Sequence, residues 1–134
     1  MDLLHALFVT YSLQFNLPPH LLESVCFVES RHEINAIHQN DGGGTPSLGV
    51  CQVKLATAQM LGYSGTEKQL MDPRLNVYYA AAYLDHQLRR YKGHTHKALV
   101  AYNRGSAKDL TRSFYSDTVV REWRDRRGRS KERQ

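Results

Sequence analysis

Apolar side chains recur at helical spacing along most of this chain, and this pattern limits the possible folds more than any other feature. The clearest run follows Asp72-Pro73 and stops near Gly93, and its members are Leu75, Tyr78, Tyr79, Ala82, Tyr83 and Leu88. Residues three or four positions apart lie on one face of an α-helix, so the run predicts a long amphipathic helix. The sequence shows no alternating strand of convincing length.

Shorter segments repeat this spacing between breaks made of proline and glycine. The first helix is expected to end before Asn16, because two prolines follow, and Pro19 suits the first turn of a second helix that reaches about His32. Gly62 fits a left-handed C-cap after a third helix. The third and the last two helices are expected at residues 55–61, 97–102 and 114–124.

Residues 35–49 have no periodicity, and their Asn, Asp, Gly, Pro and Ser side chains favour a loop, which we expect to be mobile. A two- or three-stranded patch between residues 35 and 53 stays open. A chain of 134 residues is the size of one domain with one core. The predicted fold class is therefore all-α, with at most a very small β patch.

The composition excludes several other classes of protein. Hydrophobic residues make up 41% and charged residues 23%, which is ordinary for a globular domain and unlike disordered or collagen-like chains. No run approaches the roughly 18 apolar residues of a membrane span, so we expect a soluble protein. The first nine residues contain Asp2 and lack the basic region and cleavage site of a signal peptide, so we interpret them as a helix of the mature chain.

The net charge of +5 is concentrated at the C-terminal end of the chain. Residues 121–133 hold seven basic and three acidic residues. We therefore divide the chain into a domain at 1–120, which includes the N-terminal helix, and a basic tail at 121–134. Such a tail could contact an anionic polymer such as nucleic acid, lipid headgroups or a cell-wall polymer. A solvated helix end that frays explains the same charges equally well.

Cysteine and histidine give little sign of a disulfide framework or a metal site. Cys26 and Cys51 are too few for a framework and lack the spacing of metal-ligand pairs, so a bridge stays open, but we expect free thiols that pack as small apolar residues. The histidines include His94 and His96, yet no His-x-x-x-His pair with a third ligand appears. The glycine run at 42–44 lacks the lysine of a phosphate-binding loop. We expect no metal and no cofactor.

Glu29 is the candidate acid. Cleavage of a glycosidic bond needs a carboxyl group that is still protonated near neutral pH, and apolar surroundings supply one because desolvation disfavours the anion. Glu29 follows the apolar triplet Cys-Phe-Val near the end of the second predicted helix, whereas Glu23 and Glu33 have more polar neighbours. Taken alone, a glutamate in such a place is more often a charge at the edge of a helix.

Four short motifs strengthen the case for Glu29. In order, they are Glu29-Ser30, Gly49-Val50-Cys51-Gln52-Val53, Ala101-Tyr102-Asn103-Arg104-Gly105 and the late tyrosine Tyr115. This set resembles the soluble lytic transglycosylase family, which is also similar to the goose-type lysozymes, over about residues 21–120. The family pattern reads Glu-Ser, Gly-Leu-Met-Gln, Ala-Tyr-Asn-x-Gly and then a tyrosine. Val50 and Cys51 depart from it but remain apolar.

The resemblance implies a lysozyme-like domain that cleaves peptidoglycan between N-acetylmuramic acid and N-acetylglucosamine. It implies that Glu29 is the single general acid/base, which protonates the linking oxygen and then accepts a proton from the nucleophile. With one such residue, closure of a 1,6-anhydro ring on the muramic acid is the expected outcome. The partner is therefore the peptidoglycan glycan strand, and we expect a monomer.

The resemblance also implies six supporting residues, namely Ser30, Gly49, Gln52, Tyr102, Asn103 and Tyr115. Ser30 would orient Glu29 or contact the substrate. Gly49 would let the backbone pass close to the sugar, and Gln52 would hydrogen-bond to the substrate or near Glu29. The Tyr102-Asn103 pair would line the floor of the cleft, and the late tyrosine would reach Glu29 or the muramic acid through its hydroxyl. Without the resemblance, Ser30 could equally be an exposed residue of the last helical turn, and Tyr102 and Tyr115 could be packing residues.

Other readings of the chain stay open. A hydrolase of the same fold would need a second carboxylate, for which Asp41 is the candidate, and inverting hydrolysis would need roughly 6.5 to 9.5 Å between the two carboxyl groups. A non-catalytic virion or secretion component would bind glycan or nucleic acid instead, and a DNA-binding helical domain could be built on the basic tail. The presence of both Glu29 and Gln52 argues against a catalytic domain that has lost its activity.

The expected place of action follows from the substrate. Peptidoglycan lies outside the cytoplasmic membrane, in the periplasm or cell wall, yet the sequence shows no export signal. We therefore expect a phage protein carried in the virion or released at lysis, a secretion-associated protein, or a mature chain whose leader has been removed.

Overall fold

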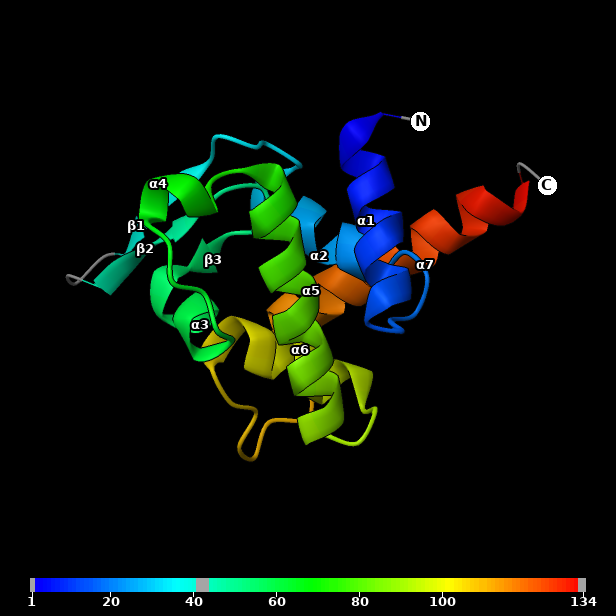
Figure 1. Ribbon diagram of the computed structural model, residues 1–134. Coiled ribbons are helices and arrows are strands. Elements are labelled where there is room, and N and C mark those ends of the chain that lie inside the picture. Colours follow the sequence, from blue (N-terminus) through cyan, green and yellow to red (C-terminus); the bar gives the residue numbers. More distant parts are fainter. Residues whose placement is uncertain (1, 41–43, 133–134) are drawn as a thin grey trace.

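Helices form most of the computed structural model, which describes residues 2–40 and 44–132, and a small sheet lies at one side (Figure 1). The helices are α1 Leu3–Gln14, α2 Leu21–Ser30, α3 Leu55–Met60, α4 Glu67–Leu70, α5 Pro73–Arg90, α6 Thr95–Arg104 and α7 Phe114–Glu132. The strands are β1 Ile37–Asn40, β2 Gly44–Leu48 and β3 Val53–Lys54. The predicted class, all-α with a very small sheet, is confirmed.

Helix boundaries follow from local side chains and backbone angles. Asp72 accepts a hydrogen bond from the backbone of Arg74, and Pro73 occupies the first turn of α5. The second helix begins two residues later than Pro19, because His20 has a left-handed backbone with φ of 70°. It ends at Ser30 rather than near His32, since Arg31 is also left-handed and caps the helix. The prediction was therefore too long at both ends.

The sheet is antiparallel with strand order β1-β2-β3. Leu48 pairs with Ile37 on one side and with Val53 on the other. The segment from Gly49 to Gln52 is thus the tight connection between β2 and β3, directly after the hairpin. Strands β1 and β2 occupy most of residues 35–49, so the expectation of a loop without regular structure was wrong there, and the small β patch that stayed open is present. Asp41 belongs to residues 41–43, which lie outside the described residues.

The core lies where α5 meets the other helices. In Figure 1, α5 runs through the middle of the molecule, with the sheet, α3 and α4 on one side and α1 and α7 on the other. Large side chains that are fully buried come from four helices and the turn after β2: Leu21, Leu22, Val25, Val50, Val77, Leu84, Leu99 and Val119. Close packing of this kind fixes the ends of α2 and α6 relative to each other.

The last helix extends through the segment that was expected to be a basic tail. The predicted end at residue 124 was too early, because α7 continues to Glu132. Trp123 donates an indole hydrogen bond of 2.8 Å to the carbonyl of Pro19. Arg126 pairs with Glu122 within α7 at 2.9 Å. It also pairs with Glu23 of α2 at 3.5 Å, and this second contact joins the two helices. Part of the basic segment therefore belongs to the packed domain.

No helix in the described ranges is both long and apolar enough to cross a membrane.

Candidate active site

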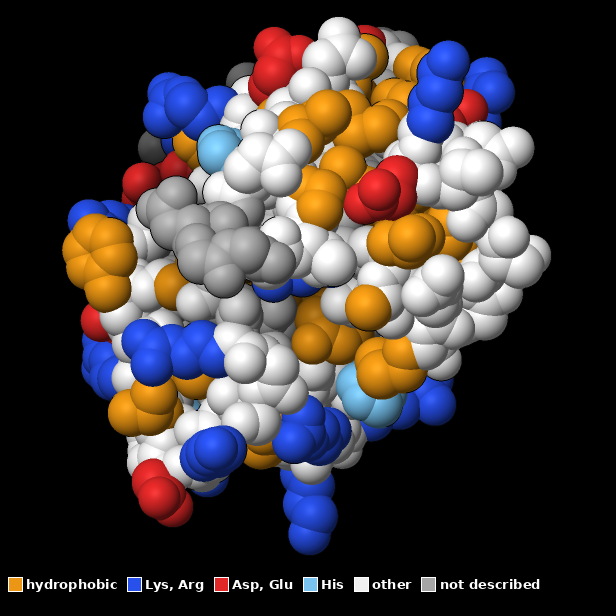
Figure 2. Space-filling view, turned by 90° about the vertical axis from the view of Figure 1, so that its left-hand side faces the viewer, with side chains coloured by type: hydrophobic (Ala, Val, Ile, Leu, Met, Phe, Trp, Pro, Cys, Tyr) orange, Lys and Arg blue, Asp and Glu red, His pale blue; other side chains and the backbone are white. Residues whose placement is uncertain are grey.

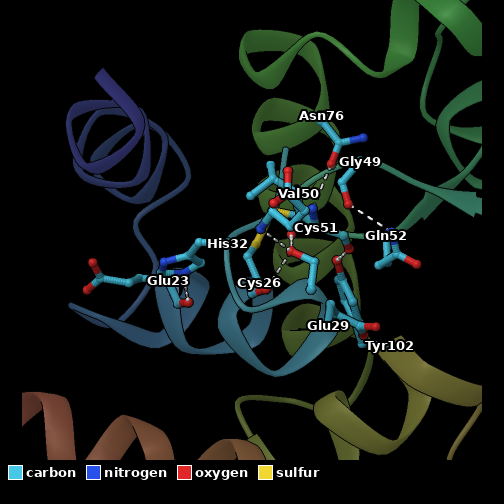
Figure 3. Close-up of a disulfide and its surroundings, with 12 residues drawn as sticks. Glu23, Cys26, Glu29, His32, Gly49, Val50, Cys51, Gln52, Asn76 and Tyr102 are labelled. Atoms are coloured by element: carbon cyan, nitrogen blue, oxygen red, sulfur yellow. Dashed lines mark hydrogen bonds between the residues drawn. A yellow bond between two sulfur atoms is a disulfide. The ribbon is translucent and has the colours of Figure 1, made fainter. Parts of the chain in front are cut away.

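A cleft of about 230 Å³ contains Glu29 and is lined mostly by polar side chains. Strands β2 and β3, helix α3, the middle of α5 and the end of α6 contribute its walls. The lining residues are Glu29, Ser47, Gln52, Val53, Lys54, Thr57, Tyr83, Tyr102, Asn103, Arg104 and Gly105. Figure 3 shows Glu29 at the end of α2, close to Tyr102 and on the same side as Gln52. Packing thus brings together three motifs that are distant in sequence.

The carboxyl group of Glu29 is held largely away from water. Burial raises the pKa of Glu29 from 4.5 to about 7, because the anion loses hydration. A hydrogen bond from Tyr115 and the nearby His38 act in the opposite direction and lower this pKa. The net result is a carboxyl group that is about half protonated at neutral pH, as a general acid requires.

Two tyrosine hydroxyls lie beside this carboxyl group. Tyr115, in the first turn of α7, donates a hydrogen bond of 2.7 Å to Oε2 of Glu29. Tyr102, on α6, donates to the carbonyl of Cys51 at 3.4 Å. Burial first, and the proximity of Glu29 second, raise the pKa of both tyrosines well above the ordinary value. Both hydroxyls therefore remain protonated and can act as donors.

Gln52 holds the turn after β2 with all of its amide hydrogens. Its Nε2 donates to the carbonyls of Ala36 at 3.1 Å and Gly49 at 2.9 Å. Its Oε1 is hydrogen-bonded to Nδ1 of His38. An amide oxygen can only accept, so Nδ1 of His38 carries the proton. Gln52 therefore joins β1 to the turn, and it also lines the cleft.

Gly49 is buried against Asn76 and is not part of the cleft lining. Its φ of 78° is left-handed, and a Cβ atom there would lie 2.5 Å from Nδ2 of Asn76. That Asn76 amide donates to the carbonyls of Leu48 and Leu70, and its oxygen accepts from the backbone of Cys51. The structure therefore places Gly49 where the turn meets α5, and its proposed contact with the sugar stays a prediction.

Ser30 connects the end of α2 to the same turn. Its hydroxyl donates to the carbonyl of Val50 at 2.6 Å and accepts from the backbone of Glu33 at 3.1 Å. The side chain has no hydrogen bond to Glu29 among the described residues. Ser30 thus fixes the backbone next to Glu29, while Asn103 is exposed and lines the cleft.

Cys26 and Cys51 form a disulfide, so the expectation of free thiols was wrong (Figure 3). Their Cα atoms are 4.3 Å apart although 25 residues separate them in sequence. The hairpin returns the chain to the inner face of α2, and this return creates a proximity that residue spacing alone does not reveal. The bridge joins the helix of Glu29 to the turn of Gln52.

Sequence reasoning missed several residues of this site. His38 lies on β1, a strand that the sequence allowed but did not predict, and His38 belongs to none of the four motifs. Asn76 follows Asp72-Pro73 within the segment that carries the family resemblance, but it was given no role in the site. Ser47, Thr57 and Tyr83 line the cleft from outside the four motifs. The second carboxylate considered for hydrolysis, Asp41, lies outside the described residues.

Comparisons with known proteins agree with the geometry. The model of the Transglycosylase SLT domain matches residues 6–118. The chain is similar to the "Transglycosylase" of Enterobacteria phage PRD1, at 35% identity over 71% of this chain and 32% of that protein. It is also similar to "Protein IpgF" of Shigella flexneri, at 27% identity over 82% of this chain and 74% of that protein. A third relative is the "X polypeptide" of Escherichia coli, at 33% identity over 80% of this chain and 66% of that protein.

The fold is also similar to a solved structure. An inactive mutant of the lytic transglycosylase Slt from Pseudomonas aeruginosa superposes with a TM-score of 0.65 at 22% identity. The match covers 89% of this chain and 20% of that one. The chain therefore spans about a third of the phage relative and a fifth of the solved protein.

Proposed function

The chain belongs to the family of transglycosylase SLT domains, and on that basis we propose that it cleaves the glycan strands of peptidoglycan with Glu29 as its single acid/base. The observation that carries the proposal is a buried carboxyl group with a pKa near 7 that lies in a cleft and accepts a hydrogen bond from Tyr115. A carboxylic acid in this state can give up a proton and recover it at neutral pH.

The first step is proton transfer from Glu29 to the oxygen that links N-acetylmuramic acid to N-acetylglucosamine. The bond between this oxygen and the anomeric carbon of the muramic acid then breaks, and the acetamido carbonyl oxygen of the same sugar stabilises the positive charge. Glu29 is now a carboxylate, and the hydroxyl of Tyr115 at 2.7 Å can stabilise it. The leaving N-acetylglucosamine keeps the proton.

In the second step the 6-hydroxyl oxygen of the muramic acid attacks the anomeric carbon. Glu29 takes the proton from this hydroxyl, so the carboxyl group returns to its starting state. The product is a 1,6-anhydro end, and no water is consumed. This route is supported by the cleft itself, in which Glu29 is the only acidic lining residue among those described.

Mass spectrometry of digested peptidoglycan tests this route directly. We expect 1,6-anhydro ends, which are lighter than reducing ends by one water molecule. Asp41→Asn serves as the matched variant, because it should leave the products and the rate unchanged if Glu29 acts alone. Reducing ends that disappear in Asp41→Asn would instead establish the two-carboxylate hydrolase.

The disulfide supports a site of action outside the cytoplasm. Disulfides form and persist in oxidising compartments such as the periplasm and the cell exterior, and the proposed substrate lies there too. We therefore propose that the protein acts in the periplasm or cell wall. We also propose that it serves either a secretion system or a phage.

The exposed arginines of α7 are proposed to bind anionic cell-wall polymers. Arg121 and Arg124 are exposed and form no ion pair within the described ranges, whereas Trp123 and Arg126 hold α7 in place. Point substitution is therefore better than truncation. Basic residues at an anionic membrane surface contribute about 1 kcal/mol each, so Arg121→Gln/Arg124→Gln should weaken the affinity for sedimented cell walls by roughly thirtyfold at low salt. Cleavage of short soluble glycans should not change, and an unaltered sedimentation would contradict the idea.

A further inference from the structure

Two cationic side chains share the cleft with Glu29. Lys54 lies at the end of β3, directly before α3, and Arg104 is the last residue of α6. Both are exposed, and both line the cleft. Their positions belong to different elements, so the cleft carries a positive charge on each of two walls.

Neither side chain has a counter-charge among the residues that the structure describes. Within residues 2–40 and 44–132, Lys54 and Arg104 make no side-chain hydrogen bond or ion pair. Other arginines of this fold do have partners, such as Arg112 with Asp117 at 2.7 Å and Arg89 with Asp85 at 3.1 Å. Arg121 and Arg124 are also unpaired in the part of the chain that the structure describes, but they lie on α7 outside the cleft. What distinguishes Lys54 and Arg104 is that both line the cleft that contains Glu29.

The electrostatics of the cleft favour an anionic ligand. Glu29 is the only acidic lining residue among those described, and it is committed to the hydrogen bond from Tyr115. On the face shown in Figure 2, where the hairpin and the loop after α6 lie, Lys and Arg side chains gather in the lower half. A cleft lined by charge of one sign concentrates the opposite charge from solution.

We propose that Lys54 and Arg104 bind a carboxylate carried by the substituent on O3 of the muramic acid. The proposal rests on the proposed function, because it takes peptidoglycan as the substrate. This substituent ends in a lactyl carboxylate when the peptide is absent, and it carries peptide carboxylates when the peptide is present. N-acetylglucosamine has neither. A guanidinium group matches a carboxylate with two parallel hydrogen bonds, and an ammonium group adds a point charge.

Neither residue has a role in the proton transfers proposed above. Arg104 occupies the variable position of the Ala-Tyr-Asn-x-Gly motif, and Lys54 follows directly after the motif that contains Gln52. They can therefore select the substrate without taking part in proton transfer. The expected consequence is a preference for strands that contain muramic acid over neutral chains of N-acetylglucosamine.

Binding to a Glu29→Gln protein tests the proposal without any turnover. The probes are chitotetraose, a peptide-free tetrasaccharide of alternating N-acetylglucosamine and N-acetylmuramic acid, and the same tetrasaccharide with its peptides. Lys54→Gln/Arg104→Gln in this background should bind at least one of the two anionic probes about tenfold more weakly, as expected for two exposed ion pairs. Affinity for chitotetraose should stay the same.

The control is Lys68→Gln/Arg74→Gln, which removes two exposed charges outside the cleft. It should leave all three affinities unchanged. A loss confined to the peptide-free probe identifies the lactyl carboxylate, and a loss confined to the peptide-bearing probe identifies the peptide. Unchanged binding of both anionic probes, or an equal loss for all three, would overturn the proposal. These outcomes do not depend on whether the wild-type protein forms anhydro ends, so the two proposals fail separately.

Discussion

Glu29→Gln is expected to lower the rate of peptidoglycan cleavage by at least about 10²- to 10⁴-fold, the usual loss when a general acid/base is removed. The amide keeps the shape of the side chain and can still accept the hydrogen bond from Tyr115. It cannot donate a proton of suitable acidity or take one back. Release of soluble fragments from purified cell walls measures the rate. Activity within a few-fold of wild type would remove Glu29 from the mechanism.

Thermal unfolding separates this loss from a loss of structure. Because the pKa of Glu29 rises from 4.5 in the unfolded chain to about 7 in the folded one, folding favours the protonated form. The wild-type protein therefore loses stability as the pH rises from 4.5 through 7, where the folded carboxyl group ionises. Gln carries no charge, so the variant should unfold at the same temperature as wild type or higher at pH 8. A much lower unfolding temperature would mean that inactivity reflects misfolding.

We expect the same carboxyl group to set the pH dependence of peptidoglycan cleavage by the wild-type protein. Glu29 must be protonated to begin the reaction, so kcat/KM should fall as the pH rises through about 7. Tyr115→Phe removes a hydrogen bond that lowers this pKa. Its alkaline limb should therefore move to higher pH even though the maximal rate decreases. A limb that stays in place would show that Glu29 does not control it.

Reduction of the disulfide between Cys26 and Cys51 is expected to lower the free energy of unfolding by about 3 kcal/mol. The bridge closes a loop with a sequence separation of 25 residues, and loss of this constraint enlarges the conformational freedom of the unfolded chain. For a domain of this size the unfolding temperature should fall by roughly 10 °C. Thermal unfolding followed by circular dichroism, with and without reductant, measures the difference.

The matched control is Cys26→Ala/Cys51→Ala, which should be insensitive to reductant. Its unfolding temperature should be no higher than that of the reduced protein, because both cysteines are fully buried and the substitution also removes packing. Alkylation in denaturant without reductant should add no label to the wild-type protein. Two labels would show that the thiols are free and would contradict the bridge.

The sequence by itself determined the fold class and indicated Glu29 as the candidate acid. Helices were predictable because their signals are local: apolar residues at helical spacing, Asp72-Pro73 at the start of α5 and glycine near helix ends. The four ordered motifs carried the family resemblance, which the match over residues 6–118 confirms. Glu29 could be proposed for a related reason, since its apolar neighbours are adjacent in sequence.

The tertiary structure alone decided how the motifs meet. Tyr115 reaches Glu29 across 86 residues, and Asn76 lies under a glycine that precedes it by 27 positions, so neither contact is visible in local patterns. The disulfide was mispredicted for the same reason. Such contacts depend on where the hairpin and the packed helices return the chain, and this is set by close packing of the whole core. The raised pKa of Glu29 is likewise a property of the assembled cleft, because desolvation requires all of its walls at once.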